Sequence, residues 1–270
     1  MTNDVIAQRG LVLLGCGKMG SAMLAGWLKR GLPATSVWVQ DPHPSDWLKS
    51  SGVHINADLP VHPAIVLVAV KPQMMGDAVP NMAHMDGGET TFVSVAAGTP
   101  ISYFEKTLGA GTPVVRAMPN TPAAVGRGIT AIVANAAGAG ALDVAEELLS
   151  AVGQVVRLEN EAQIDAVTGV SGSGPAYVFH MIETLAAGGV AQGLSPELAM
   201  QLAKATVAGA GALAEDADED PTQLRINVTS PNGTTQAALE VLMDEENGFP
   251  ALLPRAVAAA TRRAKELADG

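Results

Sequence analysis

A glycine-rich turn that directly follows a short apolar run constrains the fold of this chain more than any other feature. The apolar run covers 11–14, the turn reads G-C-G-K-M-G over 15–20, and a helical pattern follows over 21–29. This order predicts a buried strand, a tight turn and a helix N-terminus. The free amide groups and the dipole of such a helix end attract phosphate. The turn therefore predicts a binding site for the pyrophosphate of a dinucleotide.

A second apolar run, over 37–40, ends at Asp41, about 20 residues beyond the last glycine of the turn. Dinucleotide-binding folds place a carboxylate at this distance, where it accepts hydrogen bonds from a ribose. The turn and the acidic residue together predict a nicotinamide cofactor. Cys16 lies inside the turn, where a small space-filling side chain is a simpler interpretation than a reactive thiol.

The composition narrows the possible partners and the compartment. Lys and Arg number 16 against 27 Asp and Glu, so the net charge of −11 disfavours nucleic acid and anionic membranes as partners. A single cysteine excludes an intrachain disulfide and fits a reducing compartment. No apolar stretch approaches the roughly 20 residues that a membrane span requires. We therefore expect a cytoplasmic protein.

The pattern of apolar residues changes near residue 160 and predicts two domains. Over 1–160, short apolar runs alternate with helical patterns, which is typical of an α/β fold with a doubly wound, mostly parallel sheet of the Rossmann type. Over 161–270, Ala-rich segments predict an all-α domain, whose long apolar faces indicate a partner subunit. The expected strands cover 11–14, 37–40, 53–55, 65–70, 91–96, 114–118, 129–133 and 155–158. The expected helices cover 21–29, 44–50, 72–83, 101–108, 140–152, 163–168, 175–192, 196–216, 221–228, 234–245 and 249–268, with Ser195 and Asp220 as N-caps.

In a sheet of this type, the ligand lies beyond the carboxyl ends of the strands. Lys71 ends a buried apolar run there, and its side chain either contacts the cofactor or extends from the strand end into solvent. Asn120 lies between two prolines, in a turn that serves the cofactor or only the fold. The candidate cofactor-binding residues are Gly15, Cys16, Gly17, Lys18, Met19, Gly20, Asp41, Ala69, Val70, Lys71, Pro72, Ala97, Gly98 and Asn120.

Two glycine-rich turns, 171–175 and 229–235, open helices in the second predicted domain. The second turn gathers the hydroxyl groups of Ser230, Thr234 and Thr235 at one helix entrance, where amide groups can bind a carboxylate. An ordinary N-cap is the alternative interpretation. The histidines show no metal-ligand spacing, so no metal site is predicted, and His180 is expected in an apolar core.

These motifs, in this order, resemble those of the Δ1-pyrroline-5-carboxylate reductase family. The resemblance rests on the glycine turn, on A-V-K-P at 69–72, on R-A-M-P-N-T-P at 116–122, on V-S-G-S-G-P-A-Y at 170–177 and on V-T-S-P-N-G-T-T at 228–235. It extends over nearly the whole chain, and the last two motifs are specific to that family. It implies reduction of pyrroline-5-carboxylate to L-proline, the last step of proline biosynthesis, with NADPH or NADH as hydride donor.

The resemblance also implies residue roles and an assembly. It places the substrate carboxylate on the amides of Gly233, Thr234 and Thr235, with Ser173 as a further substrate contact. It brings the Thr235 hydroxyl to the ring nitrogen, so Thr235 and Ser230 are the candidate catalytic residues. In such reductases the helical domain forms a homodimer, and the dimers commonly assemble into decamers. The family usually prefers NADPH, whereas a carboxylate at Asp41 favours a ribose diol over a 2′-phosphate, so the residues leave the choice of cofactor open.

Two other functions are alternatives to this one. A β-hydroxyacid-type dehydrogenase also joins a dinucleotide-binding domain to helices, but alignment of its lysine and asparagine motif puts Val178 and Ile182 at those two positions. Neither side chain can transfer a proton. A non-catalytic dinucleotide-binding regulator is the second alternative, and it would have no use for the hydroxyl-rich turn at 230–235. Asn232 stands where the reductases often have glycine, and asparagine tolerates a left-handed backbone.

Overall fold

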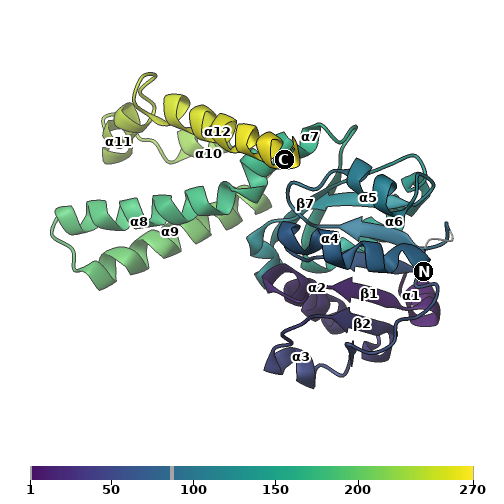
Figure 1. Ribbon diagram of the computed structural model, residues 1–270. Coiled ribbons are helices and arrows are strands. Elements are labelled where there is room, and N and C mark those ends of the chain that lie inside the picture. Colours follow the sequence, from purple (N-terminus) through teal and green to yellow (C-terminus); the bar gives the residue numbers. More distant parts are fainter. Residues whose placement is uncertain (1, 86–87, 270) are drawn as a thin grey trace. The chain divides into compact units, whose positions relative to one another are not determined.

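The computed structural model describes residues 2–85 and 88–269, and its contacts divide the chain into two compact units (Figure 1). The first unit runs to Gly172 and includes the C-terminal residues from Ala260, and the second covers Ser173–Ala259. The division falls later than the predicted boundary at residue 160. The reason is that α7 (Gln163–Val167) packs on the first unit, where its Ile164 side chain is buried in a core cluster.

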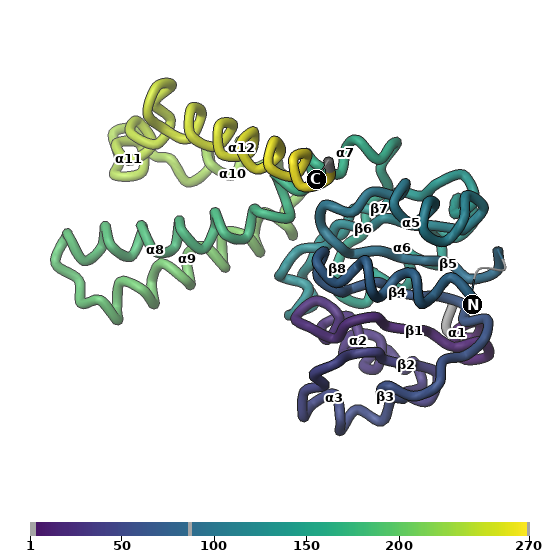
Figure 2. Tube along the Cα trace, in the orientation of Figure 1, coloured from purple at the N-terminus to yellow at the C-terminus, as the bar shows by residue number. Residues whose placement is uncertain are grey.

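Within the described residues, the first unit contains an eight-stranded sheet in the order β3-β2-β1-β4-β5-β6-β7-β8 (Figure 2). Its neighbouring strands pair in parallel except β6 and β7, which are antiparallel. This arrangement confirms the predicted α/β fold. The strands are β1 (Leu11–Leu14), β2 (Val37–Gln40), β3 (His54–Ile55), β4 (Ile65–Val68), β5 (Thr91–Ser94), β6 (Val114–Met118), β7 (Gly128–Ala134) and β8 (Gly153–Arg157).

The central strands are buried on both faces, so the sheet has a hydrophobic layer on each side. Along β1, the first and third residues belong to one core cluster and the second and fourth belong to the other, as the two-residue period of a strand requires. α2 (Lys18–Lys29) and α6 (Leu142–Leu149) contribute side chains to the first cluster. α4 (Met75–Ala78) and α5 (Ile101–Leu108) contribute to the second.

The predicted helix over 72–83 is wrong as a single element. The structure divides it into the short helical segments η2 (Pro72–Met74), α4 and η3 (Pro80–Met85). Pro80 has no amide hydrogen with which to continue the helix, and Gly76 has a low helix propensity. The other helical segments of this unit are α1 (Thr2–Arg9), η1 (Ala34–Ser36), α3 (Asp46–Ser50), η2 (Pro72–Met74), η3 (Pro80–Met85), η4 (Thr121–Val125), η5 (Ala139–Ala141), η6 (Ser150–Val152), α7 and the π-helical turn η7 (Thr168–Gly172).

A largely buried ion pair connects the middle of β6 with the start of α5. The Arg116 guanidinium lies 2.7 Å from Glu161 Oε1, and its side chain is buried on β6. The same oxygen accepts a hydrogen bond from the Ile101 amide at 2.8 Å. Because Pro100 cannot cap α5 with a side-chain oxygen, Glu161 serves as the cap from a distant part of the chain.

The two edge strands of the sheet differ in length but share polar protection. β3 is only two residues long, and the backbone of Asn56 turns into the left-handed region directly after it, at φ +49°. β8 carries Arg157, whose guanidinium makes ion pairs with Asp143 at 2.6 Å and Glu146 at 2.5 Å. One edge therefore ends in a left-handed turn, and the other carries a charged residue.

The second unit is entirely helical among the described residues, as predicted. Ser195 Oγ accepts a hydrogen bond from the Leu198 amide, and Asp220 Oδ1 accepts one from the Gln223 amide, which confirms both N-caps. Gly189 allows close approach of two helices, because a Cβ atom there would lie 3.3 Å from Ala199 Cβ. The helices are α8 (Gly174–Ala191), α9 (Pro196–Asp216), α10 (Pro221–Asn227), α11 (Thr234–Leu242) and the first part of α12 (Phe249–Asp269).

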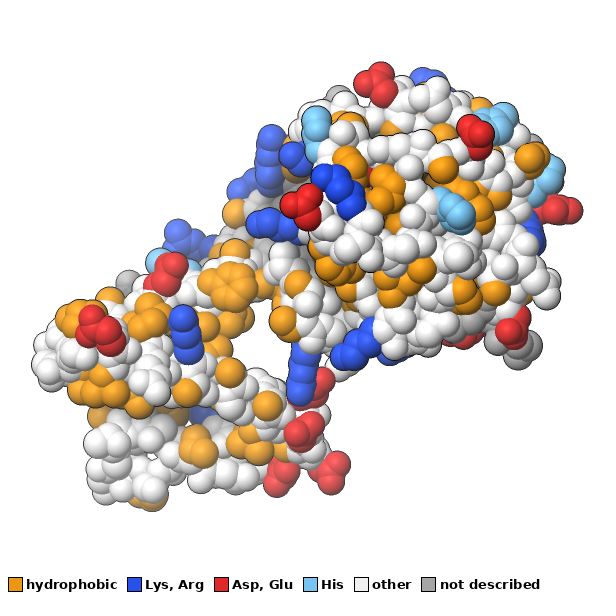
Figure 3. Space-filling model, turned by 90° about the horizontal axis from the view of Figure 1, so that it is seen from below, with side chains coloured by type: hydrophobic (Ala, Val, Ile, Leu, Met, Phe, Trp, Pro, Cys, Tyr) orange, Lys and Arg blue, Asp and Glu red, His pale blue; other side chains and the backbone are white. Residues whose placement is uncertain are grey.

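The helical unit leaves much of its apolar surface exposed. Its core cluster contains only Ala186, Ala199 and Ala203 as buried members. Large apolar side chains such as Phe179, Leu213 and Val241 are exposed, and Figure 3 shows hydrophobic side chains gathered over these helices. Such an apolar surface exceeds what a single copy of the unit covers. No helix in the described part of the chain has the length and apolarity to cross a bilayer.

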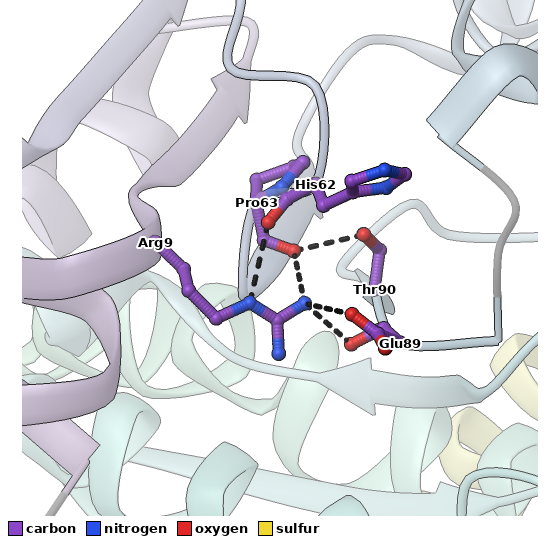
Figure 4. Close-up of polar contacts among 5 residues, drawn as sticks. All are labelled: Arg9, His62, Pro63, Glu89 and Thr90. Carbon is purple, nitrogen blue, oxygen red and sulfur yellow. Dashed lines mark hydrogen bonds and ion pairs between the residues drawn. The ribbon is translucent and has the colours of Figure 1, made fainter.

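The sequence patterns did not predict α1, which precedes the sheet. The Ile6 side chain of this helix is fully buried. Arg9, at the end of the helix, donates hydrogen bonds to the carbonyl oxygens of His62, Pro63 and Glu89 at 2.9–3.3 Å (Figure 4). The Thr90 hydroxyl donates to the same Pro63 oxygen at 2.8 Å. These bonds tie α1 to the segments that enter β4 and β5.

Candidate cofactor and substrate sites

The three glycines of the turn have different surroundings. Gly15 lies in the left-handed region at φ +86°, and a Cβ atom there would lie 2.9 Å from the Ala69 carbonyl oxygen. A Cβ atom on Gly20 would overlap the Gly15 carbonyl oxygen, so helix and strand approach closely. Beside Gly17, by contrast, a Cβ atom would meet nothing within 4 Å, and the residue is exposed. The turn is therefore closed toward the protein and open at Gly17.

Amide groups at the start of α2 face this open side of the turn. The first helical hydrogen bond runs from Ser21 N to Gly17 O, and no described side chain caps the helix. The amides of Lys18, Met19 and Gly20 precede that bond. The Cys16 amide is different, because it donates to Asp41 Oδ2 at 2.7 Å. The amides of the turn for which no acceptor among the described residues is seen are thus those at 17–20, and their binding of a phosphate stays a prediction.

The thiol of Cys16 has the character of a structural side chain. Burial, and secondly the charge of Asp41, raise its pKa to about 11. A thiol with such a pKa is protonated at neutral pH and is a poor nucleophile. This supports the interpretation of Cys16 as a space-filling residue in the turn.

The other candidate cofactor residues follow the parallel strands β4 and β5, which are neighbours in the sheet. Ala69, Val70, Lys71 and Pro72 come directly after β4, and Lys71 and Pro72 are exposed. The tight turn at Ala97 and Gly98 follows β5, with Gly98 at φ +72°. Since the carboxyl ends of parallel strands share one edge, the structure brings these segments to the same edge as the glycine turn.

Asn120 is buried, and both ends of its amide bond to the protein. Its Oδ1 accepts a hydrogen bond from the Ile129 amide at 3.0 Å, and its Nδ2 donates to the Ser171 carbonyl at 3.2 Å. The side chain therefore connects the start of β7 to the π-helical turn η7. A cofactor contact of Asn120 stays a prediction, and the geometry favours the alternative in which it serves the fold.

A cavity of about 780 Å³ lies at the carboxyl ends of β1, β2 and β4. Asp41 lines it, as does Asn56, a residue that the sequence analysis missed. The Asn56 side chain accepts from the Asp41 amide at 2.9 Å and donates to the Asp41 carbonyl at 2.8 Å. Asn56 thereby fixes the backbone that carries the acidic residue. The sequence did offer one signal for Asn56, because this polar residue directly follows the predicted strand 53–55, at the end of the sheet where ligands bind.

The hydroxyl-rich turn of the second unit leads into α11. The Thr229 hydroxyl donates to Arg225 O at 2.6 Å, and Asn232 adopts the left-handed backbone that its type tolerates, at φ +54°. The Gly233 amide donates to Ser230 O at 3.0 Å, so the predicted contact of this amide with a carboxylate is not supported. The first helical bond runs from Ala237 N to Gly233 O, which leaves the amides of Thr234 and Thr235 ahead of it.

Two further predictions concern α8. The turn that opens it ends at Ser173, whose side chain makes no capping hydrogen bond, so its hydroxyl is not committed to the helix. The expectation of a core position for His180 is wrong. Its side chain is 76% exposed and lies 3.1 Å from Glu183, because it falls on the polar side of the helix.

Comparison with known proteins connects both units to one family. The model for pyrroline-5-carboxylate reductase dimerisation matches residues 161–267, and a model for coenzyme F420-dependent NADP oxidoreductases matches residues 10–98. The chain is 40% identical to a pyrroline-5-carboxylate reductase from Pseudomonas aeruginosa over 266 residues, with 96% of this chain and 97% of the relative covered. It is 42% identical to the one from Synechocystis over 270 residues, with 95% and 97% covered.

Solved structures agree with these sequence relatives. The pyrroline-5-carboxylate reductase from Coxiella burnetii superposes with a TM-score of 0.89 at 33% identity, covering 96% of this chain and 98% of that one. A Plasmodium falciparum pyrroline carboxylate reductase, solved with NADP bound, gives 0.84 at 28% identity, with 97% and 99% covered. Sequence and structure match over both units, in the same order. The chain therefore belongs to the pyrroline-5-carboxylate reductase family.

Proposed function

We propose that this protein reduces Δ1-pyrroline-5-carboxylate to L-proline with NADPH or NADH as hydride donor. Family membership over nearly the whole chain supports the reaction. The observation that carries it is the entrance of α11, where two amides and the Thr235 hydroxyl are grouped on one helix turn. The glycine turn, open at Gly17, supports the cofactor. A cytoplasmic location is part of the proposal, since the single cysteine fits a reducing compartment.

The reaction adds a hydride to the carbon of a protonated imine, and the electron pair of the C=N bond moves to the nitrogen. The cofactor supplies the hydride. The amides of Thr234 and Thr235 would hold the substrate carboxylate, because the N-terminus of α11 carries a partial positive charge. The Thr235 hydroxyl would accept a hydrogen bond from the ring N–H, which orients the ring for attack. Ser173 and Ser230 are the further polar contacts of the proposal.

A homodimer through the helical unit is also proposed. An apolar groove of about 1060 Å³ runs along α8 and α9, and Leu242 and Phe249 complete its lining. Its lining is mostly hydrophobic and mixes large side chains with glycines and alanines, which suits the helices of a second copy. The match to a dimerisation model over 161–267 supports this occupant. Assembly of such dimers into decamers stays a prediction.

Thr235→Ala tests the proposed reaction. It removes the hydroxyl and leaves both amides in place, so turnover should fall about 10²–10³-fold, by analogy with the loss of one oriented hydrogen bond in an oxyanion hole. The affinity for the cofactor should be unchanged, and Thr235→Ser should keep part of the activity. Thr222→Ala, an exposed threonine in the first turn of α10, is the matched control and should keep full activity.

Oxidation of NADH or NADPH in the presence of pyrroline-5-carboxylate is the measurement. A Thr235→Ala enzyme with near-normal turnover and a lowered melting temperature would show that the hydroxyl only supports the helix. A wild-type protein that binds the cofactor but never oxidises it would instead favour the non-catalytic regulator.

A further inference from the structure

Asp41 presents a hydrogen-bond acceptor to the 780 Å³ cavity and cannot present a donor. Its Oδ2 accepts from the Cys16 amide at 2.7 Å, and its Oδ1 accepts from the His43 amide at 2.8 Å. A carboxylate offers about four lone-pair sites, so about two stay available. Those sites match the hydroxyl groups of a ribose, which donate. They repel a phosphate, which carries negative charge and only accepts.

Over 41–44, the first part of the loop after β2 offers no free amide to a phosphate. Pro42 and Pro44 have no N–H group, and the His43 amide is already donated to Asp41. The next side chain, Ser45, accepts a hydrogen bond from the Leu48 amide as the N-cap of α3. A 2′-phosphate on the adenosine ribose would find neither a free backbone donor nor a guanidinium over 41–44.

Two further acidic side chains line the cavity among otherwise mostly neutral residues. Asp58 and Asp77 line it together with Asp41, and His84 is the one lining side chain among the described residues that can carry a positive charge. No described Lys or Arg lines it. When like charges face each other across a binding surface, binding is weakened by several kcal/mol. A 2′-phosphate facing these carboxylates would incur such a cost.

We infer that this chain selects NADH over NADPH, and that Asp41 is the residue that determines the choice. The inference rests on the proposed use of a nicotinamide cofactor and adds which of the two is bound. It sets this chain apart from the Plasmodium falciparum reductase, which was solved with NADP bound. Asn56 acts as a positioning residue, because its side chain holds the backbone of Asp41 on both sides.

Fluorescence titration of the full-length protein with NADH and NADPH measures the two dissociation constants without any turnover. In the wild type, NADH should bind at least about tenfold more tightly than NADPH, given the like charges in the cavity. Asp41→Ser should bring the two constants close together or reverse their order. Asp46→Ser is the matched control, because it makes the same change in net charge on α3, outside the cavity lining, and should leave the ratio unchanged.

Pro42→Arg keeps Asp41 and adds a guanidinium to the lining, so it should tighten NADPH more than NADH. It also provides a test if Asp41→Ser does not fold. Equal or tighter binding of NADPH by the wild type would overturn the inference and leave the proposed reaction intact. An unchanged ratio in both cavity variants would overturn the role of Asp41. If neither cofactor binds, the proposed function itself fails.

Discussion

Removal of Glu161 should destabilise the first unit far more than removal of its partner Arg116. The Arg116 side chain is only 7% exposed, whereas that of Glu161 is 31% exposed. Glu161→Ala leaves the guanidinium buried without a counter-charge and removes the cap from the Ile101 amide. Breaking a buried pair in this way costs about 3–5 kcal/mol, and we expect the lower end of that range because one side of the pair reaches solvent.

Arg116→Met has a smaller expected cost, about 1 kcal/mol, because the remaining carboxylate is partly hydrated and still accepts from Ile101. The double variant should cost only slightly more than Arg116→Met, since the removal of both charges leaves neither one unpaired. The sum of the two single effects should therefore exceed the double effect by about 2–3 kcal/mol, a coupling typical of residues in direct contact.

Urea unfolding followed by tryptophan emission measures these values. The chain has three tryptophans, Trp27, Trp38 and Trp47, and all of them lie in the first unit, so the signal reports that unit alone. The change in free energy of unfolding follows from the shift in midpoint at constant slope. Equal losses in the two single variants, or strictly additive losses in the double variant, would refute the asymmetry argued from burial.

Three further predictions concern the glycine turn. Gly17→Ala should leave the melting temperature unchanged but weaken NADH binding, because the new methyl group meets only open space in the free protein; a loss of stability would contradict this. Gly20→Ala should instead lower the free energy of unfolding by about 1–3 kcal/mol, because its methyl group overlaps the Gly15 carbonyl oxygen. Cys16 should react with iodoacetamide at pH 8 roughly a hundredfold more slowly than a free thiol, since burial and then Asp41 raise its pKa to about 11 and keep the thiolate scarce until the pH approaches that value. Rapid alkylation at pH 8, followed by mass spectrometry, would show an exposed thiolate.

Local patterns predicted the elements whose signals are local. The predicted strands 37–40 and 114–118 and the predicted helices 101–108 and 196–216 have the observed bounds, because apolar periodicity and N-caps lie within the segments themselves. α1 carried no such signal, since Ile6 is its one fully buried apolar residue and a single residue makes no period. The antiparallel pairing of β6 with β7 also escaped prediction, because a buried apolar strand has the same pattern in either direction.

In the candidate sites, too, the features that depend on local motifs were predicted, and those that depend on distant residues were not. Glycine motifs predicted the turn at 15–20 and the entrance of α11, because the backbone geometry there depends on the glycines themselves. Which acceptor each amide of these turns bonds to depends on residues far away in the sequence. The amide of Cys16 is taken by Asp41, and Asn56 supports Asp41 from beyond β3. Such bonds join positions far apart in the chain, and no spacing rule in a single sequence reveals them.

The edges of the sheet bear on how copies of this protein can join. An open strand edge is a template on which another chain can add a strand, and long flat edges promote fibre-like growth. Here β3 offers only two residues before the backbone turns away at Asn56, and β8 carries the charged Arg157 cluster. Neither edge suits extension by a neighbour. Both features disfavour growth of a continuous sheet from one copy of the chain to the next, whereas the exposed apolar side chains of the helical unit suit contacts between copies.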